Sequence, residues 1–209
     1  MRRESATVVG LAGQVTGKVL ADLDRSGNVS VVRAPAAAPA KPDAAEAGAS
    51  PRGWESGARA MREATRRRSM FVLVAEDPLA GVAAAWSTMW EPAAAPGAPA
   101  AFEATAADAL AAWHDKKFEL PDYYLVAAPM QHSVARPDFY LGPVRSLRPR
   151  RVAVAGLPET ADAQAQADLL LDTLRSLEHG PWWPPLDVLL DAARGFYAGA
   201  LAAASAATI

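Results

Sequence analysis

The stretch ATVVGLAGQVTGKVLADLDRSGNVSVVR, residues 6–33, decides the fold. It contains an apolar run, a glycine-rich turn, a helical segment that reaches Leu23, and a second apolar run. This order is typical of a β-α-β unit, in which a helix connects two parallel strands. The sequence therefore predicts an α/β fold that begins with this β-α-β unit, with its first strand over residues 7–11.

The glycine-rich turn of this unit matches a phosphate-binding loop in part. Residues 12–19 read AGQVTGKV, with Gly17 and Lys18 where such a loop has Gly-Lys. Alanine replaces the first glycine of that loop, and Val19 stands where a Ser or Thr hydroxyl would hold magnesium. A helix beginning here would still present free N–H groups and the positive end of its dipole to a phosphate. The turn therefore predicts a phosphate site only in an atypical form.

The same turn also matches half of a dinucleotide-binding fingerprint. Gly10 and Gly13 have the spacing of its second half, but no glycine stands two residues before Gly10. Arg33 ends the second apolar run, where a basic residue would suit a ribose 2′-phosphate. We therefore take Gly10, Gly13, Gly17, Lys18 and Arg33 as candidate cofactor-binding residues, with the cofactor itself unknown. The alternative is a glycine-rich turn that only packs.

The composition limits the class of protein. At 209 residues the chain can bury one sizeable core, so we expect a single α/β domain over residues 1–209. The chain has a net charge of −2, so it lacks the excess of basic residues that is typical of a nucleic-acid-binding protein. The absence of cysteine excludes disulfides, thiolate metal sites and cysteine nucleophiles.

Neither end of the sequence indicates membrane targeting. The run after Arg3 is short, interrupted by glycine and soon charged, unlike a signal peptide. The apolar tail after Arg194 has about fifteen residues, fewer than the roughly twenty that span a bilayer. We therefore expect a cytoplasmic protein that does not associate with a membrane.

Two Ala/Pro-rich segments interrupt the apolar pattern. Residues 34–52 read APAAAPAKPDAAEAGASPR, and residues 92–101 read PAAAPGAPAA. Neither has the apolar periodicity of a helix or a strand. Both are therefore predicted to be mobile loops.

Strands and helices alternate along the rest of the chain. Residues 70–75, MFVLVA, are the clearest buried strand, and we expect further strands at 123–128 and 151–157. Five apolar strands alternating with helices predict a three-layer, Rossmann-like α/β fold with a mostly parallel sheet, helices on both faces and a C-terminal helical hairpin. The expected helices after the first unit are 54–68, 79–90, 102–118, 159–179 and a last one from residue 186.

Polar residues follow two of these strands, at the edge where parallel sheets bind ligands. Glu76 and Asp77 follow the strand at 70–75, and His132 and Ser133 leave the strand at 123–128. A helix cap accounts for Asp77 and leaves Glu76 without a structural role. His132, Ser133 and Glu76 are therefore the candidate catalytic residues, although sequence neighbours seldom have the geometry of a catalytic triad. The histidines lack metal-ligand spacing, so we predict no metal site.

Two groups of arginines precede strands instead of following them. One group is residues 66–68, and the other is Arg148, Arg150 and Arg151. This order predicts that both groups lie at the opposite edge of the sheet, where they do not serve the same pocket as Arg33. A solvated charged surface is the expected structure.

Three functions are compatible with these patterns. The first is a non-catalytic α/β protein that binds a protein partner, through Trp86, Trp182 or Trp183, or that retains a degenerate ligand crevice. Alanine-rich helices would also allow a homo-oligomer. The first alternative is a nucleotide-dependent enzyme that uses the turn at residues 10–18 for a phosphate-bearing ligand, and the second is a small-molecule hydrolase or transferase that uses His132.

Overall fold

The computed structural model describes residues 6–33, 53–91, 94–129, 138–158 and 160–206. Five strands form one sheet in which every neighbouring pair is parallel, in the order β2-β3-β1-β4-β5. This confirms the predicted α/β fold with a parallel sheet. The strands are β1 (Thr7–Gly13), β2 (Val29–Val32), β3 (Phe71–Val74), β4 (Tyr123–Pro129) and β5 (Val152–Leu157).

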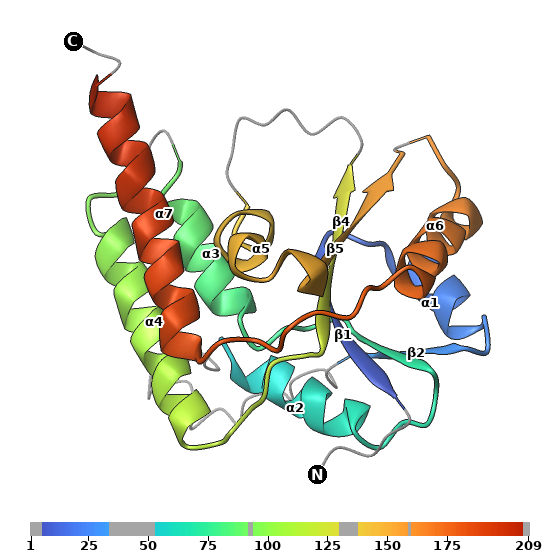
Figure 1. Ribbon diagram of the computed structural model, residues 1–209. Coiled ribbons are helices and arrows are strands. Elements are labelled where there is room, and N and C mark those ends of the chain that lie inside the picture. The colour runs from blue at the N-terminus through green and yellow to red at the C-terminus, as the bar shows by residue number, and fades with distance from the viewer. Residues whose placement is uncertain (1–5, 34–52, 92–93, 130–137, 159, 207–209) are drawn as a thin grey trace, which may run out of the picture.

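Helices cover both faces of this sheet (Figure 1). Helices α1 and α6 pack against each other on one face, and α2, α3, α4 and α7 lie on the other. The long helices are α1 (Gly17–Asp24), α2 (Glu55–Ala64), α3 (Ala80–Thr88), α4 (Ala98–His114), α6 (Ala163–Arg175) and α7 (Leu186–Ala206). Between β4 and β5, a π-helical turn, η2 (Tyr140–Val144), leads into the short α5 (Arg145–Leu147) and the 3₁₀ turn η3 (Pro149–Arg151).

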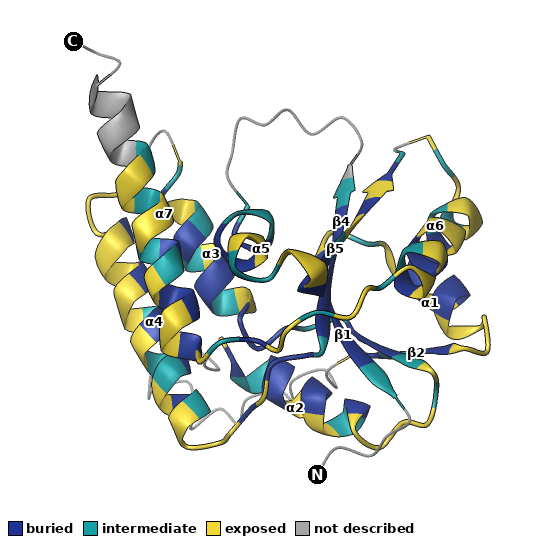
Figure 2. Cartoon of the chain, in the orientation of Figure 1, coloured by how far each residue is buried: buried dark blue, intermediate teal, exposed yellow. Residues whose placement is uncertain are grey.

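Alternation of side chains along the strands assigns each residue to one of these layers. In β1, Val9 and Leu11 belong to the apolar cluster beneath α1 and α6, whereas Val8 and Ala12 face the other layer. Both faces of the central strands are therefore buried, while the outer sides of the helices carry the exposed residues (Figure 2). This burial explains why the strands read as continuous apolar runs.

Two details differ from the sequence predictions. Helix α4 begins at Ala98, inside the segment predicted as a loop over 92–101, because its proline stands in the first helical turn, where no N–H is needed. The two C-terminal helices do not form a hairpin, since α6 packs on α1 and α7 packs on α4 and η2 across the sheet (Figure 1). The other predicted loop, 34–52, lies outside the described residues.

Arg151 is buried, which corrects its assignment to a solvated surface. Its guanidinium donates to the backbone oxygens of Asp122, Gly180 and Pro181 at 2.7–3.1 Å. It also lies over the rings of Tyr123 and Trp182, with the guanidinium carbon 4.8 and 4.7 Å from the ring centroids. These partners accept from the guanidinium and surround its planar group, which offsets part of the cost of burying the charge.

A glycine in the first turn of helix α2 allows this helix to pack closely against the turn between β3 and α3. A Cβ at Gly57 would lie 2.2 Å from the backbone nitrogen of Pro78 and 2.4 Å from the carbonyl carbon of Asp77. Backbone atoms cannot move aside as the end of a flexible side chain can. The first turn of α2 therefore approaches the β3–α3 turn as closely as it does only because residue 57 has no side chain.

No helix in the described part of the chain combines the length and the apolar composition that crossing a bilayer requires.

We predict that Gly57→Ala lowers the free energy of unfolding by about 2 kcal/mol, because the new methyl group forces α2 away from the β3–α3 turn. Urea unfolding of the two proteins measures the difference. Gly195→Ala is the matched control, since a Cβ there, in an exposed part of α7, meets no atom within 4 Å. That control should raise the free energy of unfolding by about 0.5–1 kcal/mol. Equal effects of the two substitutions would contradict the proposed contact.

Candidate functional site

A crevice of about 300 Å³ opens at the carboxyl ends of β1 and β3. The chain leaves β1 toward α1 on one face of the sheet and leaves β3 toward α3 on the other face. Such a divergence at neighbouring strands leaves space for a ligand. The residues of its wall that bear on its chemistry are Gly13, Ser56, Gly57, Glu76, Asp77 and Tyr140.

Glu76 supplies the crevice with a half-exposed carboxylate. The Oγ of Ser56 donates a hydrogen bond to its Oε2 at 2.5 Å. Ser56 lies in the first turn of α2, so the close approach at Gly57 is what brings this hydroxyl to Glu76. Glu76 forms no ion pair with any residue in the described ranges. The pair can therefore accept hydrogen bonds from a ligand that carries hydroxyl or amino groups.

Asp77 is the buried neighbour of Glu76, with only 4% of its surface exposed. Tyr124 of β4 donates to its Oδ1 at 2.9 Å, and Tyr140 of η2 donates to its Oδ2 at 2.5 Å. The backbone N–H of Leu79, just before α3, also donates to the carboxylate. Asp77 is therefore not the N-cap of α3 that the sequence predicts, since that helix begins at Ala80 and its N-cap is Leu79. Its carboxylate instead joins β3 to β4 and η2.

Burial raises the pKa of Asp77 from 3.8 to about 6, because removal from water disfavours the charged carboxylate. The hydrogen bonds from Tyr140, Tyr124 and Leu79 stabilise the charged form and limit the rise. Burial and the adjacent carboxylate also raise the pKa of both tyrosines well above 10, so both keep the protons that they donate. Asp77 is therefore a structural acceptor that titrates near neutral pH.

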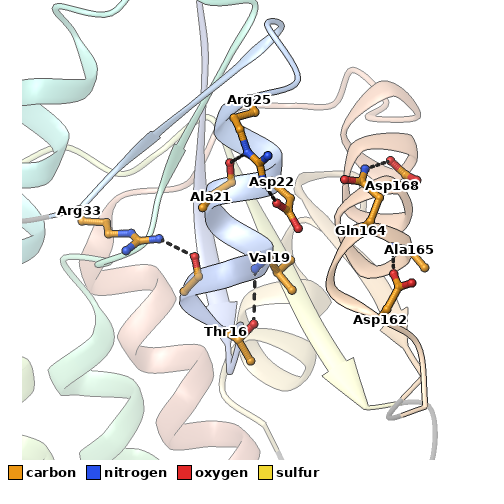
Figure 3. A network of polar contacts seen from close by, with 11 residues as sticks. Thr16, Val19, Ala21, Asp22, Arg25, Arg33, Asp162, Gln164, Ala165 and Asp168 are labelled. Carbon is orange, nitrogen blue, oxygen red and sulfur yellow. Dashed lines mark hydrogen bonds and ion pairs between the residues drawn. The ribbon is translucent and has the colours of Figure 1, made fainter.

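The turn from β1 to α1 borders the crevice at Gly13. Thr16 caps α1, since its Oγ1 accepts the N–H of Val19 at 3.4 Å (Figure 3). Arg33 donates to the carbonyl oxygen of Gly17 at 3.2 Å, which places a guanidinium beside the same helix terminus (Figure 3). Lys18 is exposed and forms no ion pair within the described residues. Two cations and a helix dipole thus make this terminus electropositive.

Packing explains the two glycines of β1. A Cβ at Gly10 would lie 2.9 Å from the ring of Tyr124. Gly13 has a φ of +95°, and a Cβ there would lie 2.2 Å from the carbonyl oxygen of Ala127. Gly13 also pairs with Ala127 in the β1–β4 ladder, so β1 continues through the start of the predicted phosphate-binding loop. Both positions need glycine whether or not a ligand binds.

The structure separates the predicted site residues into groups. Gly13 and Glu76 line the crevice, whereas Gly17, Lys18 and Arg33 gather at the start of α1, and Gly10 lies within β1. His132 and Ser133 lie outside the described residues. Ser56 and Tyr140 were missed because no short-range pattern marks them; their positions depend on contacts with the β3–α3 turn, which lies far from them in the sequence. In the described part of the chain, no three acidic or histidine side chains gather closely enough to hold a metal ion.

Comparison with known proteins gives one distant structural match. No protein-family model matches the sequence, and no curated protein sequence matches it. The fold matches that of the NadR protein in its crystal structure in complex with NR, with a TM-score of 0.43 and 15% sequence identity. The match covers 88% of this chain and 54% of the NadR chain, so this chain spans about half the length of NadR. At this similarity the comparison carries no argument about function.

Asp77 should make stability depend on pH. Its pKa is about 6 in the folded protein and near 3.8 in the unfolded chain, so the folded state binds this proton more tightly. The resulting stabilisation is fully present below pH 3.8 and is lost as the pH rises through 6, by up to about 3 kcal/mol. Asp77→Asn removes this titration. The free energy of unfolding of the variant, relative to the wild type, should therefore increase between about pH 4 and pH 7 in urea unfolding experiments.

A second variant checks the cause of this dependence. Tyr140→Phe removes one donor to the carboxylate, so it should move the midpoint of the pH dependence to a higher pH. A difference between Asp77→Asn and the wild type that does not change with pH would contradict the titration of Asp77.

Proposed function

We propose that the chain is a non-catalytic α/β protein whose crevice binds a small anionic compound that carries hydroxyl groups. The observation that carries this proposal is the Glu76–Ser56 pair, a carboxylate and a hydroxyl held 2.5 Å apart in the crevice at the carboxyl ends of the strands. A carboxylate in such a position accepts hydrogen bonds from the hydroxyl groups of a ligand. Within the described ranges, the Glu76 side chain forms no hydrogen bond or ion pair other than the Ser56 bond.

The start of α1 supports the inference that the ligand carries a negative group. The dipole of this helix, the exposed ammonium of Lys18 and the guanidinium of Arg33 all favour a negative group there. Gly13 belongs to the crevice and precedes this terminus by a few residues, so one compound can reach both regions. A phosphorylated compound with free hydroxyl groups has the required combination.

Binding is favoured over phosphoryl transfer by the surroundings of Val19. This residue occupies the position at which a phosphate-binding loop uses a hydroxyl to hold magnesium. Its side chain is 1% exposed and packs in the core between α1 and the sheet. Ala12 and Gly13, which would open such a loop, are paired with β4 instead. Both observations support a crevice that holds a ligand without the metal-assisted step.

A thermal-shift screen tests the proposal. The purified chain is melted with ATP, GTP, NAD, NADP and phosphorylated metabolites, each with and without magnesium. A compound that binds the folded state raises the melting temperature. We expect a shift that does not require magnesium, that is lost in Glu76→Gln and that is reduced in Lys18→Ala.

Glu178→Gln is the matched control, because it makes the same change at an exposed carboxylate that pairs with Arg150. It should leave the ligand shift unchanged. The proposal is wrong if Glu76→Gln and Glu178→Gln behave alike, or if the chain turns over a nucleotide in the presence of magnesium.

Association with a protein surface is the second candidate, and Trp182 is the observation that favours it. Its side chain is 48% exposed and lines a groove of about 430 Å³ with Trp113 and Pro184. Trp86 and Trp183 are buried, and their indole N–H groups donate to backbone oxygens in the core. Trp183 also lines this groove, but Trp182 is the tryptophan that offers a partner a largely exposed ring, and Trp86 is out of reach.

Sedimentation velocity tests the self-association form of this candidate. Trp182→Ser removes the exposed ring, so it should move any association to a higher protein concentration. Circular dichroism checks that the variant remains folded. A wild-type chain that stays monomeric, or an association that the substitution leaves unchanged, would contradict this candidate.

A further inference from the structure

Four arginine side chains surround a second groove, which has a volume of about 440 Å³. Arg33, directly after β2, forms one part of its wall, and Arg59, Arg62 and Arg66 of α2 and its C-terminal turn form the rest together with Glu63. The order of residues along the chain predicts that Arg66 lies at the edge of the sheet remote from the pocket of Arg33. The structure corrects this, because α2 is only about 15 Å long and its exposed arginines connect the two edges.

The charge of this groove is not balanced by the described residues that line it. Four arginines and one acidic residue, Glu63, line the groove. Arg62 also donates to the carbonyl oxygen of Lys117 at 3.2 Å, which neutralises none of its charge. Glu63 contacts Arg66 at 3.3 Å and is shared with Arg67 at 3.2 Å. Arg59 has no ion pair with any residue in the described part of the chain. The excess of positive charge is local, since the whole chain carries a net charge of −2.

The arrangement of the arginines lowers the stability of helix α2. Arg59, Arg62 and Arg66 follow one another at intervals of three and four residues and are all exposed. Like charges at this spacing are neighbours on a helix surface and destabilise it. The opposite face of α2, which contains Ala58 and Met61, is buried against the body of the protein. The arginines therefore cannot turn away from the groove by rotation of the helix.

We propose that this groove binds a compact small molecule that carries two or more phosphate groups. Guanidinium groups match phosphate oxygens with paired hydrogen bonds. Arg59 and Arg66 are about 10 Å apart along the helix axis, so they would contact different anionic groups of one ligand. The volume of the groove is that of a small-molecule site. The net negative charge of the chain disfavours an extended nucleic acid.

This site is separate from the crevice of the proposed function. The two share no wall residue. Arg33 belongs to both regions, because it lines the groove and its guanidinium also donates to the carbonyl oxygen of Gly17 at the start of α1. The variants that test each site therefore leave Arg33 unchanged. Glu76→Gln, which tests the crevice, should therefore leave binding in the arginine groove unchanged, and the two proposals can fail independently.

Isothermal titration calorimetry of the full chain with inorganic tripolyphosphate tests the inference, with inorganic monophosphate for comparison. Tripolyphosphate should bind more tightly, and its affinity should fall as salt is added. The double substitution Arg59→Gln with Arg62→Gln should weaken binding at least about tenfold, because two of the four cations are removed. The matched control is Arg150→Gln with Arg175→Gln, which makes the same change of charge at exposed arginines outside the groove and should leave the affinity unchanged.

Folding of each variant is checked by its thermal melting. Arg66→Gln, which lies beyond the last residue of α2, gives a second test if the double variant does not fold. The inference is overturned if the wild-type chain does not bind tripolyphosphate, or if the groove variants and the control variant bind it equally. It is also overturned if a single-stranded oligonucleotide binds the groove more tightly than tripolyphosphate, since the partner would then be a nucleic acid.

Discussion

The buried carboxylate of Asp77 is the interaction on which the carboxyl edge of the sheet depends. It accepts hydrogen bonds from Tyr124, Tyr140 and the backbone of Leu79, and so joins β3, β4, η2 and the approach to α3. The three donors reduce the cost of burying the carboxylate, but burial still dominates its pKa. The wall of the crevice is therefore built from a polar network, in which the loss of one member leaves the others unsatisfied.

The two candidate sites differ in the charge that they present. The crevice offers a carboxylate and a hydroxyl from Glu76 and Ser56, whereas the arginine groove offers guanidinium groups from α2 and the end of β2. The start of α1 lies beside both, through Gly13 on one side and Arg33 on the other. A chain of almost zero net charge thus has separate regions of opposite sign, which attract different ligands or different parts of one ligand.

Sequence pattern predicted the elements of this fold and much less of the site. The apolar runs and the turns between them mark all five strands, because burial on both faces of a parallel sheet leaves a continuous apolar run. The predicted C-terminal helical hairpin is not formed, since the path of residues 176–185 separates α6 from α7 and that segment has no periodicity from which its path could be predicted. Ser56 and the buried Arg151 were missed for a related reason. Each takes its role from backbone atoms distant in sequence, the β3–α3 turn for Ser56 and three carbonyl groups for Arg151.

The segment between α6 and α7 connects the two faces of the sheet across the amino ends of its strands. Arg151 binds the carbonyl groups of Gly180 and Pro181 there, and Trp183 donates to Pro121 before β4. These hydrogen bonds hold the two outer layers together at the amino edge of the sheet, while the opposite edge carries the crevice. Substitutions at Ser56 and Glu76 can therefore change what the crevice binds without loosening the contacts that hold the two layers together.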